Sequence, residues 1–313
     1  MAVKSRSRLF QFIGYLAIRA FDWFIQSIPI SWALADARLM GWLAYHLDRR
    51  HRLAAAENLR QAFPDLPDDE IDRRVRSSFE HLFVMTVETL LLARRITPAN
   101  VGRFARVAMD PDKYREVMDL LSSQRPSIIM TGHLGNWEVM NLALSTLGHH
   151  ASIVARRLDN PFLDRYIREM RSSLGLQIID KDGASHAAEA VLQKGGILGL
   201  VGDQDAGSKG LFVEFFGRPA STFKSIALLS LQFNAPILVV ACVRTGEALK
   251  HEVFLVDSID PADYQSDPNA VRAITLRYTK ALESIVRAHP EQYFWLHRRW
   301  KSQPRAGKAR QAA

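Results

Sequence analysis

From Ser127 onward, short strand-like runs alternate with helix-like runs, and this alternation constrains the fold more than any other feature of the 313-residue chain. The strand-like runs span residues 127–131, 151–155, 176–179, 196–201, 236–243 and 251–256. The helix-like runs span residues 137–147, 161–174, 185–194 and 222–233, followed by one from Asp267-Pro268 to about residue 288. Strands that alternate with helices of this length are typical of crossover units. We therefore predict an α/β fold with a mostly parallel central sheet flanked by helices.

The first 50 residues are apolar and aromatic and lack the strand–helix alternation. Basic residues at positions 4, 6 and 8 precede an apolar run, which Arg19 and Asp22 interrupt. These two side chains are three positions apart and could pair on a helix. A span of about twenty uninterrupted apolar residues is missing. We expect helices that lie in or dip into a membrane rather than cross it; the alternative is an ordinary amphipathic helix pair that caps the domain.

The chain divides into three expected segments: membrane-associating helices in residues 1–50, a domain in residues 51–301 and a basic, disordered tail in residues 302–313. Within the domain, residues 51–120 are expected to be a helical lead-in and residues 121–301 an α/β core. The formal net charge of +8 favours anionic partners. No nucleic-acid-binding motif is present in the sequence, so an anionic membrane surface or a phosphorylated substrate is the expected partner.

Residues 131–138, Thr-Gly-His-Leu-Gly-Asn-Trp-Glu, join a predicted strand to a predicted helix. This is the junction at which open α/β sheets place ligands and chemistry. His133 would lie in the loop, Asn136 would be the N-cap, and Glu138 would lie in the first helical turn. A carboxylate that bonds one imidazole nitrogen leaves the other free to act as a base. We therefore predict that Glu138 orients His133.

Three further segments place charged side chains near the same sheet edge. Arg156 follows the strand at 151–155, and an arginine there can bind phosphate or carboxylate in two-point geometry. Asp203, Gln204 and Asp205 follow the strand at 196–201 and precede an aromatic patch, in which Phe212, Phe215 and Phe216 could line a groove. Near the C-terminus, Arg298 belongs to a basic stretch that could hold phosphate or anionic lipid headgroups.

These segments together resemble the lipid A biosynthesis (lauroyl/myristoyl) acyltransferase family, within the lysophospholipid/glycerolipid acyltransferase superfamily. The resemblance rests on "TGHLGNWE" at 131–138, "DQD" at 203–205 with the aromatic segment that follows, and "FWLHRRWK" at 294–301. It extends over roughly residues 45–301. Two positions depart from the family pattern, because Arg157 and Glu214 stand where a proline is usual.

The resemblance implies an O-acyltransferase that moves a fatty acyl chain from an acyl carrier protein or coenzyme A thioester to a hydroxyl of a membrane glycolipid. A lipid A precursor is the expected acceptor, with phosphatidylinositol mannoside-type glycolipids as an alternative. The implied catalytic residues are His133 and Glu138, and no metal or cofactor is expected. The implied location is the cytoplasmic face of the inner membrane. The implied substrate-binding residues are Asn136, Arg156, Asp203, Gln204, Asp205 and Arg298.

Attack on a thioester develops an oxyanion, for which the backbone amides of residues 135–137 at a helix N-terminus are candidate donors. Two other functions remain open. In one, the chain is a metal-dependent phosphoesterase with His133, Asp203 and Asp205 as ligands. In the other, it is a non-catalytic basic protein that binds lipid. The single cysteine, Cys242, lies in an apolar strand-like run and is expected to be a small buried hydrophobe.

Overall fold

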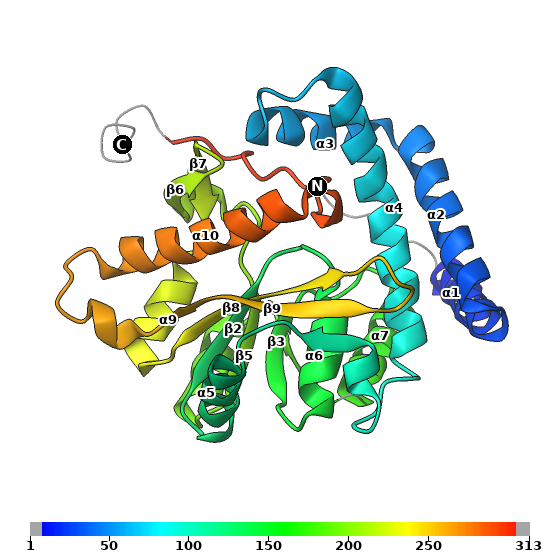
Figure 1. Ribbon diagram of the computed structural model, residues 1–313. Helices are drawn as coiled ribbons and strands as arrows, with labels where there is room; N and C mark the ends of the chain where they lie inside the picture. The colour runs from blue at the N-terminus through cyan, green and yellow to red at the C-terminus, as the bar shows by residue number, and fades with distance from the viewer. Residues whose placement is uncertain (1–7, 174, 305–313) are drawn as a thin grey trace.

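The computed structural model describes residues 8–173 and 175–304, and at its centre is a seven-stranded sheet (Figure 1). The strand order is β1-β9-β8-β2-β5-β3-β4. The five strands from β8 to β4 are parallel, whereas β9 pairs antiparallel with β8 and β1 runs parallel to β9. The predicted mostly parallel sheet is confirmed. The strands are β1 (Ala105–Val107), β2 (Ser127–Thr131), β3 (Ala151–Ala155), β4 (Gln177–Asp180), β5 (Ile197–Val201), β8 (Ile237–Arg244) and β9 (His251–Ile259).

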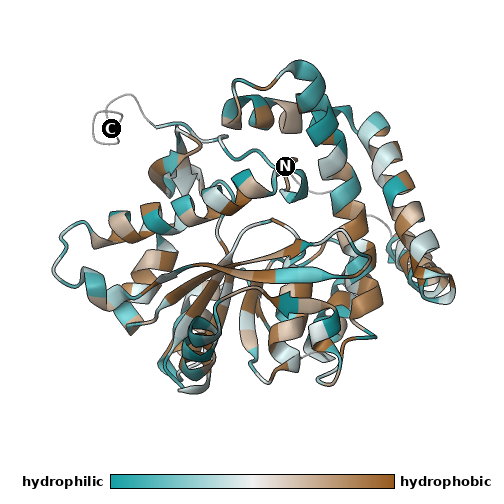
Figure 2. Ribbon diagram, viewed as in Figure 1, coloured by the Kyte–Doolittle hydropathy of each residue, from teal (hydrophilic) through white to brown (hydrophobic). Residues whose placement is uncertain are grey.

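Helices cover both faces of the sheet, because successive side chains of a central strand point to opposite faces and both are apolar. Ile129 of β2 packs in the cluster that includes side chains of α5 and α6, whereas its neighbours Ile128 and Met130 pack in the cluster of α8, α9 and α10. Figure 2 shows hydrophobic residues concentrated along these central strands. The helices are α5 (Pro111–Ser122), α6 (Trp137–Thr146), α7 (Pro161–Ser173), α8 (Ala184–Gln193), α9 (Ser225–Phe233) and α10 (Ala270–Ala288).

All six predicted strands and five predicted helices of the α/β region are present, but the sequence pattern missed three features. The first feature is β1, which belongs to the sheet although it precedes residue 121, the expected start of the α/β core. A three-residue edge strand carries too little pattern to be recognised from sequence. The other features are the helix α5 and a hairpin of β6 (Leu211–Phe215) and β7 (Arg218–Thr222), which pair outside the main sheet. Phe216 and Gly217 have φ values of 54° and 71° and form its two-residue turn.

The chain before β1 forms a helical layer beside the carboxyl edge of the sheet (Figure 1). No helix in the two described ranges is both long and apolar enough to cross a membrane. Residues 305–313, most of the expected C-terminal tail, lie outside the described residues, as do the basic positions 4 and 6. The layer consists of α1 (Arg8–Ser27), α2 (Ile30–Leu47), α3 (Arg49–Ala62) and α4 (Asp68–Leu92); short 3₁₀ turns lie at η1 (Val101–Arg103), η2 (Gly207–Lys209), η3 (Pro261–Tyr264) and η4 (Pro290–Gln292).

The pairing expected within α1 does not form, because Asp22 points into the protein. Its carboxylate is 1% exposed and accepts hydrogen bonds from Arg94 at 2.6 Å and from the Tyr166 hydroxyl at 2.7 Å. Arg19 instead donates to the Tyr15 hydroxyl at 3.1 Å. Asp22 therefore joins α1 to α7 and to the segment after α4, which fixes the N-terminal helix against the α/β domain.

The close approach of α2 to α4 depends on Gly41. A Cβ atom added at this position would lie 2.5 Å from the Glu80 Cα and 3.0 Å from the Phe79 carbonyl oxygen. Both obstructing atoms belong to the backbone of α4 and cannot turn away as a side chain would. The two helices can pack at this distance only with glycine at position 41.

We expect Gly41→Ala to push α2 away from α4 and to lower the free energy of unfolding by about 1–3 kcal/mol, the usual cost of overpacking. Chemical denaturation of the purified protein measures this change. Gly102→Ala is the matched control, because an added Cβ there meets nothing within 4 Å. Equal stability of the two variants would contradict the close-packing argument.

Candidate active site

The turn after β2 is fixed to neighbouring segments through its backbone. Gly135 has φ of 59°, and a Cβ at this position would lie 1.9 Å from the Cys242 carbonyl oxygen. Its amide donates to the Gln292 carbonyl at 2.9 Å, and the Asn136 amide donates to the Cys242 carbonyl at 2.7 Å. Only glycine tolerates both the positive φ and this close approach. The turn is therefore held between β8 and the segment that follows α10.

His133 lies in this turn and is paired with Asp203, which follows β5. The His133 Nδ1 lies 2.7 Å from Asp203 Oδ1, and the His133 backbone amide donates to Asp203 Oδ2, also at 2.7 Å. Asp203 is 1% exposed at its side chain and His133 is 19% exposed. Because β2 and β5 are neighbouring parallel strands, their carboxyl ends bring the two residues together.

The pairing sets the proton positions on His133. A buried carboxylate accepts the proton on Nδ1, which leaves the lone pair of Nε2 free in the neutral imidazole. Burial lowers the pKa of His133, but the adjacent Asp203 carboxylate outweighs burial, so the pKa of His133 is raised above its ordinary value. Burial likewise raises the pKa of Asp203, but the His133 ring and amide outweigh it and hold the pKa well below its usual range. Asp203 therefore remains an anion beside His133.

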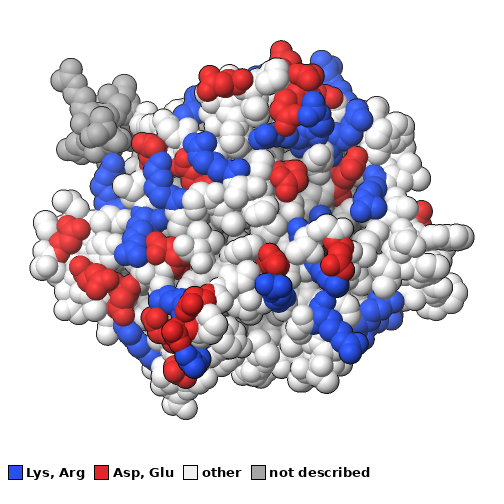
Figure 3. Space-filling model, in the orientation of Figure 1, with Lys and Arg blue, Asp and Glu red and all other residues white. Residues whose placement is uncertain are grey.

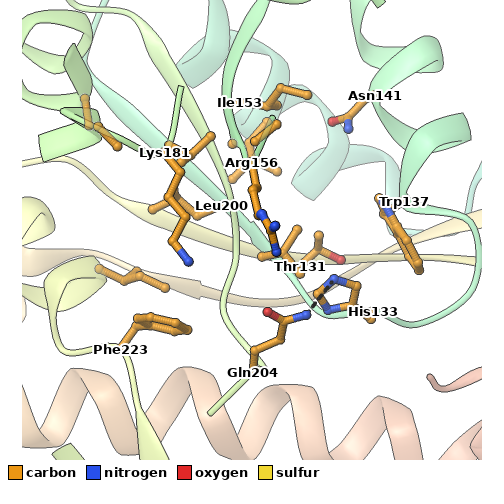
Figure 4. A pocket seen from close by; sticks show the side chains of 18 of the residues that line it. Thr131, His133, Trp137, Asn141, Ile153, Arg156, Lys181, Leu200, Gln204 and Phe223 are labelled. Carbon is orange, nitrogen blue, oxygen red and sulfur yellow. Dashed lines mark hydrogen bonds between the residues drawn. The ribbon is translucent and has the colours of Figure 1, made fainter. Parts of the chain in front are cut away.

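A cavity of about 520 Å³ opens beside His133 between the ends of β2, β3 and β5. Gln204 lies beside the ring, and its side-chain nitrogen is 3.5 Å from His133 Nε2 (Figure 4). Trp137 makes an edge contact with the imidazole, with ring centroids 5.0 Å apart. Arg156 also lines this cavity, as predicted for a residue at the end of β3. His133, Arg156 and Gln204 are thus brought together in one site.

Glu138 does not orient His133, contrary to the prediction. It lines the same cavity, but its carboxylate pairs with Arg171 of α7, with the Arg171 Nε donating to Glu138 Oε2 at 3.1 Å. The acid bonded to His133 is Asp203, from a strand 70 residues further along the chain. Local spacing could place Glu138 at the helix start, but it could not show which carboxylate reaches the ring.

Asn136 is the N-cap of α6, as predicted, and it does not line the cavity. Its side chain is fully buried; Oδ1 accepts from the Val139 amide at 3.1 Å and from the Thr89 hydroxyl at 3.2 Å. Its Nδ2 donates to the Met85 carbonyl and to Glu88. The Asn136 side chain therefore holds the turn and does not face the cavity.

Asp205 and Arg298 lie outside the cavity lining. Asp205 accepts a hydrogen bond from the Ser302 hydroxyl at 2.9 Å and thereby holds the C-terminal segment. Arg298 is exposed, whereas its neighbour Arg299 is buried and donates to the Ser221 carbonyl and the Thr222 hydroxyl, both at 2.7 Å. Sequence pointed to this basic segment but gave no signal for which of the two arginines is built into the protein.

The acyl groove expected at the aromatic patch is not found at two of its three positions. Phe215 and Phe216 are 1% and 5% exposed and pack with Trp295 and Trp300 in a hydrophobic cluster. Apolar residues from β3, β5 and α9 line the cavity instead, among them Ile153, Leu200, Ile226 and Leu229. The apolar side of the cavity is therefore formed by the sheet and the helices that cover it.

The backbone amides at the start of α6 differ in their availability. Those of Gly135 and Asn136 are used inside the protein, as described above. The Trp137 amide, the first of the helix, has no acceptor within the described residues. Of the three amides considered from the sequence, this one remains free to bind an anion at the helix N-terminus.

The ligand set required for a metal-dependent phosphoesterase is not assembled. His133 and Asp203 bond each other, while Asp205 is turned toward Ser302. Within residues 8–173 and 175–304, no group of three or more His, Cys, Asp or Glu side chains is arranged to hold a metal ion. The arrangement that does exist is an imidazole with one nitrogen bonded to a buried carboxylate and the other facing a cavity, which is the geometry of a general base.

We expect Asp203→Asn to lower the pKa of His133, because an amide neither attracts the imidazolium nor accepts its proton as a carboxylate does. NMR titration of the His133 ring measures this change, with the midpoint in the wild type above that of a free imidazole and moved to lower pH in the variant. Asp205→Asn is the matched control and should leave the midpoint unchanged. An unchanged midpoint in Asp203→Asn would show that the pair does not exist in solution.

Comparison with known proteins gives a consistent result over nearly the whole chain. The family model described as bacterial lipid A biosynthesis acyltransferase matches residues 3–302. A lipid A biosynthesis acyltransferase of Haemophilus influenzae is 26% identical over 271 residues, which cover 84% of this chain and 82% of the relative.

Two further relatives carry related names. The lipid A biosynthesis palmitoleoyltransferase of Escherichia coli is 24% identical, with 85% of this chain and 83% of the relative covered. A phosphatidylinositol mannoside acyltransferase of Mycobacterium tuberculosis is also 24% identical, but the match covers only 56% of this chain and 54% of the relative. On the family match and on these relatives, the chain belongs to the bacterial lipid A biosynthesis acyltransferase family and is an acyl-transferring enzyme.

Proposed function

We propose that this enzyme moves a fatty acyl chain from an acyl carrier protein or coenzyme A thioester to a hydroxyl of a lipid A precursor, with His133 as the general base. The observation that carries the proposal is the His133–Asp203 pair, which leaves Nε2 as an unprotonated acceptor at a cavity with one apolar side, where its partner is the Gln204 side-chain nitrogen at 3.5 Å. The relatives named for lipid A match more than four-fifths of the chain, whereas the mannoside acyltransferase matches about half. That difference supports a lipid A-type acceptor.

In the proposed reaction, His133 Nε2 takes the proton from the acceptor hydroxyl as the oxygen attacks the thioester carbonyl. The new ester C–O bond forms, the C–S bond breaks, and the departing thiolate receives the proton from the imidazolium. Asp203 stabilises that imidazolium, because it remains an anion throughout. The acyl group passes directly to the acceptor: the only cysteine, Cys242, is fully buried, and burial raises the pKa of its thiol well above the ordinary value.

Charged groups around the cavity suit anionic substrates. Arg156, Arg171 and Lys181 all line it, and within residues 8–173 and 175–304 the ion-pair partner of Arg156 is the exposed Asp159, at 3.0 Å. A phosphate of the acceptor or of the donor can replace that exposed carboxylate in two-point geometry. Glu138 holds Arg171 at the cavity wall, so we propose that Glu138 contributes to substrate binding through this arginine. The free Trp137 amide is the proposed donor to the oxyanion.

We expect His133→Ala to lower acyl transfer by at least 10²–10⁴-fold, the usual contribution of a general base, while the protein stays folded. The measurement uses an acylated carrier protein and a lipid A precursor as substrates, with mass spectrometry of the product lipid. His149→Ala, in the loop after α6, is the matched histidine control. Vesicle binding without acyl transfer by the wild type would favour a non-catalytic lipid-binding protein, and full activity of His133→Ala would exclude the proposed base.

A membrane-facing surface is proposed on α1 and α2, where large apolar side chains are exposed. In Figure 3, the side on which Figure 1 places these helices is largely free of charged side chains. Asp22, the acid that interrupts the apolar run, is buried against the domain and does not reach this surface. The exposed side chains are Leu9, Phe10, Phe12, Ile13, Leu16, Trp23, Phe24, Trp32, Leu39, Met40, Trp42, Leu43 and Leu47.

Such a surface suits helices that lie in the plane of a membrane with their apolar side among the acyl chains. Indole rings at the membrane–water interface are a common feature of these anchors. Because the surface belongs to the same layer as α4, which packs against the catalytic turn, it would hold the cavity near lipid substrates. We propose that the enzyme works at the cytoplasmic face of the inner membrane.

We expect the double variant Trp23→Glu and Trp32→Glu to bind vesicles of phosphatidylethanolamine and phosphatidylglycerol at least about tenfold more weakly, since each buried aromatic side chain is worth more than about 1.4 kcal/mol. Vesicle sedimentation measures the binding. Leu228→Glu is the control, because Leu228 is 44% exposed but lies on α9. A loss of binding in the control but not in the double variant would place the membrane surface elsewhere.

A further inference from the structure

A buried network of charged and polar side chains lies beneath the catalytic turn and has no part in the proposed proton transfer. Its members are Glu88 and His81 of α4, Arg244 at the end of β8 and His251 at the start of β9. Glu88 is 0% exposed and His251 is 1% exposed. Burying charged groups is costly unless each is paired. The hydrogen bonds and ion pairs of these four residues therefore show which segments of the chain they hold together.

Glu88 is the centre of the network. Arg244 donates to its two carboxylate oxygens at 2.6 and 2.9 Å, and His251 Nε2 lies 3.2 Å from Oε2. The Asn136 side-chain amide also faces Oε2, at 3.4 Å. Burial raises the pKa of Glu88, but the hydrogen bonds from His251 and Arg244 outweigh it and lower the pKa to about 2. Glu88 is therefore an anion that ties α4 to β8, β9 and the catalytic turn.

His81 connects this ion pair to Gly135. Arg244 Nη1 lies 3.1 Å from His81 Nδ1, and His81 Nε2 lies 3.1 Å from the Gly135 carbonyl oxygen. Since a guanidinium only donates and a carbonyl only accepts, His81 must accept at Nδ1 and donate from Nε2. Only one neutral tautomer does both. Burial and the Arg244 charge lower the pKa of His81 to about 3, so this tautomer persists at neutral pH.

The opposite side of the turn is held by the same arginine through its backbone. The Arg244 amide donates to the Gln292 side-chain oxygen at 2.9 Å, and the Gln292 side-chain nitrogen donates to the Arg244 carbonyl at 3.0 Å. The Gln292 carbonyl in turn accepts from the Gly135 amide at 2.9 Å. Arg244 thus holds both backbone groups of Gly135 indirectly, the amide through Gln292 and the carbonyl through His81.

We propose that His81 is a positioning residue for acyl transfer: oriented by the Glu88–Arg244 ion pair, it holds the Gly135 carbonyl and so keeps the Trp137 amide available to the oxyanion. The turn carries His133 on one side of Gly135 and the first amide of α6 on the other. A rotation of the Gly135–Asn136 peptide would move both relative to the substrate. This inference rests on the proposed acyl transfer, because it assigns a role within that reaction.

The test compares two substitutions of the same side chain. His81→Leu removes both hydrogen bonds, whereas His81→Gln offers an acceptor to Arg244 and a donor to the Gly135 carbonyl. We expect His81→Leu to lower kcat by about 10²-fold, as when an oxyanion-hole donor is lost, with KM for the acyl donor changed less than about threefold. His81→Gln should restore most of kcat. The pH midpoint of kcat/KM should stay that of His133 in both variants, because His81 does not titrate in the assay range.

A second readout does not depend on activity. Hydrogen exchange of the segment 133–139 should be faster in His81→Leu than in the wild type, and should return toward the wild-type rate in His81→Gln. Ile274→Val is the stability control, because Ile274 is a fully buried residue of α10 whose hydrophobic cluster contains no residue of the segment 133–139. It should lower the melting temperature without changing kcat or exchange in this segment.

The possible outcomes separate the inference from the proposed function. If the wild-type enzyme transfers no acyl group, the proposed function fails, while the exchange measurement still decides whether His81 holds the turn. If the enzyme is active and His81→Leu keeps kcat within about threefold of wild type, the positioning role is overturned. A loss of kcat that is no greater than in Ile274→Val at equal thermal stability would also overturn it, since a general loss of stability would then explain the lower kcat.

Discussion

The site depends on the backbone contact between Gly135 and β8. The Cys242 carbonyl occupies the space that a side chain at position 135 would need, and it accepts the amide of Asn136 at 2.7 Å. That contact sets the direction in which the chain leaves β2, the point at which α6 begins and the side of the turn on which His133 projects. This single contact between the turn and β8 therefore determines where the turn lies relative to the buried charged pairs below it and to the cavity above it.

Three carboxylates near the turn have different roles because their surroundings differ. Asp203 is buried and is bonded to both the His133 ring and the His133 amide, so its charge stabilises the protonated imidazole. Glu138 lies at the cavity wall and pairs with Arg171, the arginine proposed to bind substrate. Buried Glu88, also ionised, meets neither substrate nor base and serves to hold the turn. Position relative to the cavity, and not residue type, separates these roles.

The N-terminal helices and the α/β domain are parts of one functional arrangement. α4 packs against α2 through Gly41 and also contributes His81 and Glu88 beneath the turn. α1 contacts α7 through Asp22 and Tyr166, and α7 carries Arg171 to the cavity. The proposed membrane surface is therefore connected to both sides of the site through packed helices, which would place the cavity at the depth where lipid substrates lie.

The sequence by itself determined the alternation of strands and helices, the strand-to-helix turn with His133 and the N-cap role of Asn136. These follow from local periodicity and from turn chemistry, which involve residues a few positions apart. Only the tertiary structure decided that Asp203 bonds His133, that Glu138 bonds Arg171 and that Arg299 is the buried arginine. It also brought His81, Glu88 and Arg244, which belong to no recognisable motif, beneath one turn. The physical reason is that parallel strands place their carboxyl ends side by side whatever their separation in sequence, so His133 and Asp203 meet although they are 70 residues apart. The packing of α4 against the turn and the end of β8 likewise brings His81 to Arg244, 163 residues away.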